Sequence, residues 1–250
     1  MNLLQHAMRA AQTAAAPALR RLECALVVGG GGALGSALLG EALVAGRFQR
    51  VAAVITAPLA STVRGFDPLP VAALQAGDAR GAEVAFVVFE RTRHSNGRDD
   101  AFLQPVPEDL LPIATALRAG GVRRLVVVVP HAPALLPQAL KAGFASEDEG
   151  AVAALGFEHL VFLRAAQAGT AAVGGSRLQR FAAWWLGQLV LMVPTREQPV
   201  RAVKLAALVV QLARLLPSAT PGTRVVPQEL LWQASQADAE AVLGAWLAPP

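Results

Sequence analysis

A run of glycines between an apolar segment and a helical one is the first candidate for binding chemistry in this sequence. Two registers fit a dinucleotide-binding loop, GxGxxG from Gly30 and GxxGxxG from Gly29. In either register one glycine permits a tight turn, a second admits the pyrophosphate, and a third lets the helix pack on the strand. The free N–H groups of the helix then face the anion. The residues predicted to bind the cofactor here are Gly29, Gly30, Gly32, Ala33, Leu34 and Gly35.

The choice between NAD and NADP depends on the residues that follow the second predicted strand, residues 51–55. NAD sites usually place an acid there for the ribose hydroxyls, whereas this chain reads Thr56-Ala57-Pro58. Arg64 would suit a 2′-phosphate, so NADP is slightly preferred; the alternative is that Arg64 is a plain surface charge. Asp78, after Gly77, is expected either near the adenine or as a helix-cap or turn residue.

His131 and Lys141 are the candidates for catalysis. A neutral histidine can donate or accept a proton near pH 7, and Lys141 would orient the ribose. The alternatives are a loop histidine between Pro130 and Pro133 and a solvated charge on a helix. No metal site is expected, because the chain has one cysteine and its four histidines lack ligand spacing.

Strands that alternate with helices predict the architecture that must position these residues. Continuous apolar runs indicate parallel strands covered on both faces, which favours an α/β fold with a Rossmann doubly wound sheet. After residue 164 the strand pattern fades, and a small, mainly helical C-terminal lobe is expected. The predicted strands are 25–28, 51–55, 84–89, 125–129 and 160–163, with helices over 33–45, 108–119, 139–155, 177–193, 201–216 and 228–247.

Two segments between these elements are less regular. Residues 60–70 are predicted as a loop, and residues 71–74 as either a third strand or a turn. The expected organisation is an N-terminal helix or tail (1–22), an NAD(P)-binding core (23–165) and the helical lobe packed on it (166–250).

Composition and charge limit the kinds of partner that this chain is expected to bind. The chain of 250 residues is 54% hydrophobic, has a net charge of +4 and contains one cysteine, which favours a cytoplasmic protein. Eight basic residues and one acid lie between residues 160 and 224. The apolar segment around Trp184-Trp185 is either a core helix, a contact to the inner face of the membrane, a protein-partner groove or a pocket for an apolar small molecule. Nucleic-acid binding is not expected.

The order and spacing of these motifs resemble the extended and atypical short-chain dehydrogenase/reductase superfamily, and most closely its Tat-interacting-protein branch of NAD(P)H-binding proteins. The resemblance spans about residues 24 to 215 and implies a Rossmann core with a cofactor cleft. Beside the glycine loop, it rests on Gly77-Asp78, the strand 83–88 followed by Thr92-Arg93, Phe102, Ala119-Gly120-Gly121-Val122, the strand 125–129, residues 157–164 and residues 198–203.

The departures from that family are equally informative. Its members use a serine after the fifth strand and a Tyr-x-x-x-Lys pair, in which lysine lowers the tyrosine pKa. This chain contains no tyrosine, reads Val129-Pro130-His131 after that strand, and places Lys141 and Ala145 near the expected pair. The sequence therefore predicts a cofactor-binding protein with weak, altered or no oxidoreductase activity. The alternatives are a reductase that uses His131 or Lys141 and a non-catalytic scaffold built on a retired Rossmann fold.

Overall fold

The computed structural model describes residues 22–44, 48–59, 63–90, 99–131, 147–166 and 200–248. Within these ranges seven strands form one parallel sheet in the order β3-β2-β1-β4-β5-β6-β7. The strands are β1 (Leu22–Val28), β2 (Phe48–Ile55), β3 (Phe66–Pro70), β4 (Val84–Val88), β5 (Arg124–His131), β6 (His159–Ala166) and β7 (Gly222–Val226).

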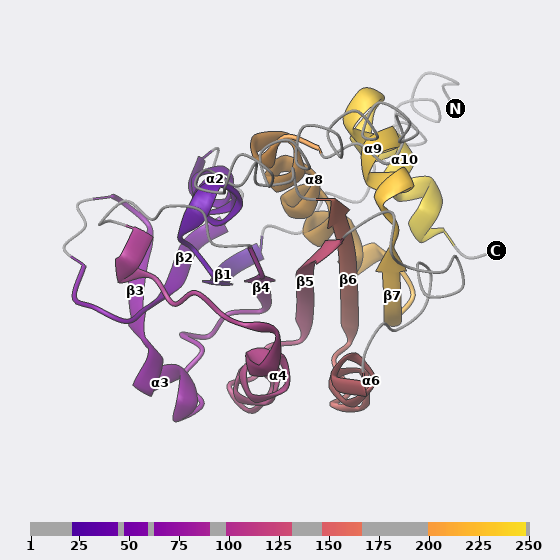
Figure 1. Ribbon diagram of the computed structural model, residues 1–250. Helices are drawn as coiled ribbons and strands as arrows, with labels where there is room; N and C mark the ends of the chain where they lie inside the picture. Colours follow the sequence, from indigo (N-terminus) through magenta and orange to yellow (C-terminus); the bar gives the residue numbers. More distant parts are fainter. Residues whose placement is uncertain are drawn as a thin grey trace, which may run out of the picture.

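Helices cover both faces of this sheet (Figure 1). On one face α2 packs against α8, and on the other α4 packs against α3 and α6. The helices are α2 (Gly32–Leu43), α3 (Val71–Gln75), α4 (Leu110–Ala119), α6 (Glu147–Ala154), α8 (Ala202–Leu215), α9 (Gln228–Gln236) and α10 (Ala239–Leu247), with short 3-10 turns η2 (Asp99–Ala101), η3 (Pro107–Asp109) and η6 (Leu216–Ser218).

The central strand β4 is apolar at every residue because both of its faces are buried. All five residues of β4 are buried. Successive side chains point to opposite faces, so Phe86 joins the core under α2 and α8 while Ala85 and Val87 join the core over α3, α4 and α6. The predicted α/β architecture with a doubly wound parallel sheet is confirmed, and a helical C-terminal region is present.

The third strand and the helix after it correct the sequence analysis. Residues 66–70, predicted as part of a loop, form β3, and residues 71–75 form α3 instead of a strand or turn. The strand was missed because it reads Phe66-Asp67-Pro68-Leu69-Pro70, with two prolines and one fully buried side chain, Leu69. Proline is tolerated here because β3 lies at the edge of the sheet, where half of the backbone donors have no partner strand.

The region after residue 200 contributes to the main sheet as well as to a helical layer. Strand β7, Gly222–Val226, pairs with β6 and was not predicted. Helix α8 lies beside α2 and shares its hydrophobic core, as expected for residues 201–216. The predicted helix over 228–247 is divided at Asp238, whose carboxylate accepts the Glu240 N–H at 3.0 Å and caps α10.

Because all strands are parallel, the sheet has an amino edge, where the strands begin, and a carboxyl edge, where they end. The strand order reverses between β1 and β4, and in doubly wound folds the ligand crevice lies at the carboxyl edge beside the ends of two such strands. In the described part of the chain, no helix is both long enough and apolar enough to span a bilayer.

Charged side chains gather at the amino edge around β5 and β6. Arg124 is 6% exposed and pairs with Glu83, and burial lowers the pKa of its guanidinium. His159 is 1% exposed, and burial lowers the pKa of its imidazole despite Glu158 at 3.7 Å. The folded protein therefore holds His159 neutral at a pH where the unfolded chain would protonate it.

Because His159 is held neutral in the folded protein, we expect the free energy of unfolding to decrease as the pH is lowered. Below the ordinary histidine pKa of 6.5 the unfolded chain binds the proton, so stability decreases until the lower pKa of folded His159 is reached. Within that window the slope is about 1.4 kcal/mol per pH unit. Urea unfolding of wild type and His159→Leu between pH 7.5 and 4.5 measures it. Parallel pH profiles for the two proteins would contradict the prediction.

The packing of α8 on α2 predicts a large difference between two substitutions on one helix. Leu212 is 1% exposed in the core under α2, so Leu212→Ala should lower the free energy of unfolding by about 2–5 kcal/mol. Val203 is 71% exposed, so Val203→Ala should change it by less than about 0.5 kcal/mol. Chemical denaturation checks both variants, and equal losses would show that α8 does not pack as described.

Candidate dinucleotide site

The glycine loop lies at the carboxyl edge between β1 and α2, in the strand–turn–helix context that the sequence predicts. Gly29 has φ +88°, and a Cβ there would lie 2.3 Å from the Val88 carbonyl oxygen of the neighbouring strand. A Cβ on Gly35 would lie 2.0 Å from the Gly29 carbonyl oxygen. Glycine at these two positions therefore lets the first turn of α2 rest directly on the end of β1.

The first turn of α2 has no capping side chain of its own. Its N-cap residue is Gly31, and the turn contains no acidic residue. Among the predicted cofactor residues at this end, Ala33 is exposed while Leu34 and Gly35 are buried. We call the N–H groups of this turn, together with the loop that leads to it, the α2 anion site, because helix N-termini attract negative charge.

A carboxylate from the segment that follows β4 lies on the α2 anion site. The Leu34 N–H donates to Glu90 Oε2 at 3.0 Å and to Oε1 at 3.3 Å. A Cβ on Gly32 would be 2.5 Å from Glu90 Oε2, so the carboxylate stands directly over that glycine. The sequence analysis missed Glu90. Its signal was available: a single acid directly after the six apolar residues 84–89.

The segment 99–103 lies across the end of β2. The Thr56 N–H donates to the Ala101 carbonyl at 2.8 Å, and the Leu103 N–H donates to the Val54 carbonyl at 3.0 Å. On its other side the segment touches the glycine loop, since a Cβ on Gly31 would be 2.7 Å from the Asp99 carbonyl oxygen. In doubly wound folds this position beside the second strand receives the cofactor ribose.

Two predicted cofactor residues, Arg64 and Asp78, lie away from the glycine loop. Phe66 of β3 pairs with Val51, which places Arg64 at the level of Gln49 near the amino edge. Val28, the residue before Gly29, lies level with Val54, which is five residues further along β2 than Gln49. At 3.3 Å per residue, Gly29 is therefore about 20 Å along the strand direction from Arg64. Arg64 is exposed there and too distant to meet a 2′-phosphate in the crevice.

Asp78 follows α3, not the third strand, and it shapes a turn. Its Oδ1 accepts the Arg80 N–H at 2.8 Å, and Arg80 has φ +53°. The Arg80 carbonyl in turn accepts a hydrogen bond from Arg50, which pairs with Cys24 in the amino half of β1. Asp78 therefore fills the role of turn residue that was its alternative, and it does not reach the adenine side of the crevice.

Of the two predicted catalytic residues, the structure describes only the backbone of His131. The backbone of His131 ends β5 at the carboxyl edge, where it pairs with Ala166. This position is three residues beyond Val128, which lies level with the end of β4. Lys141 and the Trp184-Trp185 segment lie outside the described residues.

A buried ion pair that the sequence analysis missed lies at the same edge. Both terminal guanidinium nitrogens of Arg164 donate to Glu149, Nη1 to Oε1 and Nη2 to Oε2, each at 2.5 Å. Arg164 and Glu149 are each 3% exposed. Because Glu149 lies in the first turn of α6, the pair fixes that helix end to the last residues of β6.

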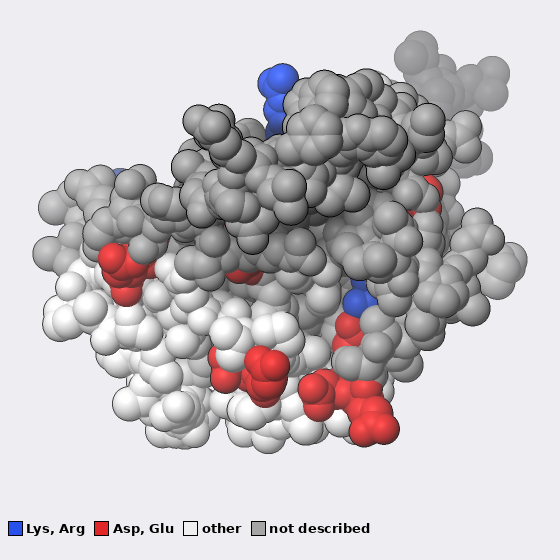
Figure 2. Space-filling view, in the orientation of Figure 1, with Lys and Arg blue, Asp and Glu red and all other residues white. Residues whose placement is uncertain are grey.

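Acidic side chains dominate the described surface near this edge. Helices α4 and α6 follow β4 and β5, so both begin at the carboxyl edge, and Figure 2 shows acidic side chains gathered over them. They come from η3 and from the first turn of α6, namely Glu108, Asp109, Glu147 and Asp148. Within the described ranges, no three His, Cys, Asp or Glu side chains are arranged to hold a metal ion.

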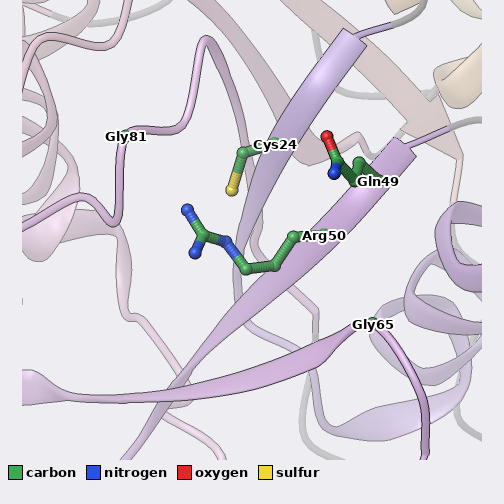
Figure 3. A pocket seen from close by; sticks show the side chains of 5 residues that line it. All are labelled: Cys24, Gln49, Arg50, Gly65 and Gly81. Atoms are coloured by element: carbon green, nitrogen blue, oxygen red, sulfur yellow. The ribbon is translucent and has the colours of Figure 1, made fainter.

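A separate cavity of about 380 Å³ lies at the amino edge. Cys24, Gln49, Arg50, Gly65 and Gly81 line it, and the Arg50 guanidinium extends toward Cys24 (Figure 3). The hydrogen bond with Cys24 is the main cause of the raised pKa of Arg50. Cys24 itself is 3% exposed. The cavity is at the opposite end of β1 from the glycine loop, so it is distinct from the crevice.

Comparison with known proteins gives similarity of fold. No family model and no curated protein matches the chain. A variant of uronate dehydrogenase from Agrobacterium tumefaciens, complexed with NAD, is 14% identical with a TM-score of 0.47, over 91% of each chain. The Bordetella bronchiseptica enzyme WbmG, in complex with NAD and UDP, is 17% identical with a TM-score of 0.46, over 90% of this chain and 80% of that one. UDP-N-acetylglucosamine 4-epimerase from Bacillus cereus is 15% identical with a TM-score of 0.44, over 82% and 79%.

The close approach of Gly35 to Gly29 predicts opposite effects for two glycine substitutions in α2. Gly35→Ala forces a Cβ into the Gly29 carbonyl oxygen and should lower the free energy of unfolding by about 1–3 kcal/mol or more. Gly40→Ala meets no atom within 4 Å and should raise it by about 0.5–1 kcal/mol through helix propensity. Thermal and urea unfolding measure both variants. A tolerated Gly35→Ala would mean that α2 does not rest on β1 as described.

Proposed function

We propose that this protein binds a nicotinamide dinucleotide in the crevice beside the ends of β1 and β4, with the pyrophosphate at the α2 anion site. The observation that carries the proposal is the contact between the Leu34 N–H and the two oxygens of Glu90. This contact supports the proposal because it shows two anionic oxygens beside the N-terminus of α2, where a pyrophosphate would lie. Gly29, Gly30, Gly32 and Ala33 would line the same site.

We further propose that NAD is bound in preference to NADP. The preference for NADP rested on Arg64, which lies near the amino edge. The end of β2 is instead bonded to η2, because the Thr56 hydroxyl donates to the backbone carbonyl of Asp100, and η2 carries two acidic residues, Asp99 and Asp100. Negative charge beside the ribose suits its hydroxyl groups and repels a 2′-phosphate.

The chemistry that follows binding would differ from that of tyrosine-dependent dehydrogenases. The dinucleotide, when bound, supplies a hydride donor or acceptor. The chain has no tyrosine to move the accompanying proton. His131, at the end of β5, is the proposed proton-transfer residue, and Lys141 is the proposed ribose contact. The proposed activity is therefore weak, altered or absent oxidoreductase chemistry.

A second candidate function is a non-catalytic interaction protein built on a Rossmann fold. The occupation of the crevice by Glu90 and by residues 99–103 favours it. In that case the Trp184-Trp185 segment would meet a protein, an apolar small molecule or the membrane surface. Liposome flotation of the purified protein, with and without cofactor, distinguishes the membrane case from the first candidate.

Isothermal titration with NAD⁺, NADH, NADP⁺ and NADPH tests dinucleotide binding. We expect saturable binding, with the NAD forms tighter than the NADP forms. Ala33→Asp places a carboxylate in the exposed part of the first turn of α2, where it should weaken binding at least tenfold by repelling the pyrophosphate while leaving the fold intact.

The matched control is Val44→Asp, which adds the same charge at the exposed C-cap of the same helix, about 16 Å from Ala33 at 1.5 Å per residue. It should bind like the wild type. An absence of saturable binding up to millimolar dinucleotide would refute the proposal.

A further inference from the structure

We propose that the Glu90 carboxylate is an internal, displaceable ligand of the α2 anion site, which competes with the pyrophosphate of an incoming dinucleotide. The inference rests on the proposed function, and it adds a mechanism that sets the affinity of the same site. In the empty protein the carboxylate caps α2. Dinucleotide binding requires that it leave.

The contacts of Glu90 are those that a bound anion would make. Both of its oxygens lie within hydrogen-bond distance of the Leu34 N–H, at 3.0 and 3.3 Å. One of them also stands over Gly32, where a Cβ would approach it to 2.5 Å. The glycine loop keeps that space free of side chains so that an anion can approach the backbone. Glu90 and a pyrophosphate would therefore occupy the same space and accept from the same donor, the Leu34 N–H.

The helix needs such a ligand when no cofactor is bound. The N-terminal N–H groups of a helix have no partner within the helix, and a side-chain oxygen at the N-cap usually accepts from one of them. In α2 the N-cap is Gly31 and the first turn is free of acids, so its own residues cannot do this. Glu90 supplies the missing oxygen from a neighbouring strand.

The position of Glu90 also allows it to leave. The backbone before it is anchored, because the Phe89 N–H donates to the Val128 carbonyl at 3.0 Å. The Glu90 side chain is half-buried, and no described cation forms an ion pair with it. Rotation of this side chain into solvent therefore breaks its contact with the helix and leaves the sheet intact.

Charge removal at this one position is the test. Glu90→Gln keeps the size of the side chain and an oxygen that can accept from Leu34, but it removes the negative charge. We expect it to bind NAD⁺ and inorganic pyrophosphate at least tenfold more tightly than the wild type, which corresponds to about 1.4 kcal/mol. Glu108→Gln is the matched control, because Glu108 is an exposed acid in η3 and its loss should leave both affinities unchanged.

Calorimetry with the two probes separates this inference from the proposed function. Equal affinity of wild type and Glu90→Gln for both probes overturns the inference and leaves dinucleotide binding standing. Tighter pyrophosphate binding by Glu90→Gln without any NAD⁺ binding supports the internal ligand and rejects the proposed function. Absence of binding of either probe to either folded protein rejects both.

A second variant covers the case in which Glu90→Gln fails to fold. Glu90→Ala removes both the charge and the hydrogen bond, and it should also bind pyrophosphate more tightly if it folds. Thermal unfolding of all variants is recorded first. If Glu90→Gln and Glu90→Ala both fail to fold, Glu90 is an indispensable cap that cannot be displaced, and the inference is overturned.

Discussion

The contact between Gly35 and the Gly29 carbonyl is the constraint from which the rest of the candidate site follows. A Cβ at Gly35 would lie 2.0 Å from that oxygen, so the first turn of α2 can sit on the end of β1 only because the side chain is absent. This contact fixes the direction in which the N–H groups of α2 point. The Glu90 carboxylate lies in the space over Gly32, where a Cβ would approach its Oε2 to 2.5 Å.

An intact binding loop and an occupied crevice are compatible in this fold. Glycines keep the space over the loop open from below, while Glu90 and residues 99–103 enter it from other elements. An unpartnered helix N-terminus is unfavourable, and a carboxylate relieves that cost with backbone hydrogen bonds and helix-dipole attraction. A doubly wound protein that spends part of its time without cofactor therefore gains from such a residue, at the expense of affinity.

Buried charged side chains lie at both edges of the sheet. At the amino edge the Arg124–Glu83 pair and the neutral His159 are held among the first residues of β5 and β6. At the carboxyl edge the buried Arg164–Glu149 pair holds the start of α6 beside the last residues of β6. Breaking a buried pair leaves an uncompensated charge, so loss of either partner would destabilise the attachment of α6 to β6.

The sequence by itself determined the features that depend on neighbouring residues. Continuous apolar runs predicted β1, β4, β5 and β6, because the middle of a strand that is buried on both faces is made mainly of apolar side chains. The glycine loop was identified from its own spacing, and the absence of tyrosine argued against the usual proton relay without any coordinates. The edge strand β3 and the last strand β7 were missed, since one face of each is less constrained and their residues do not form an apolar run.

Only the tertiary structure decided which residues meet. Arg64 and Asp78 follow the expected elements in chain order, yet the loop from β2 to β3 and helix α3 return the chain to the amino edge before those residues appear. Glu90 is 56 residues from Leu34 along the chain, and their contact exists because β4 lies next to β1 in the sheet. Sequence spacing reports periodicity along a segment, whereas strand order and register set the contacts between segments. For that reason the sequence located the glycine loop, and the fold alone placed Glu90 against the first turn of α2.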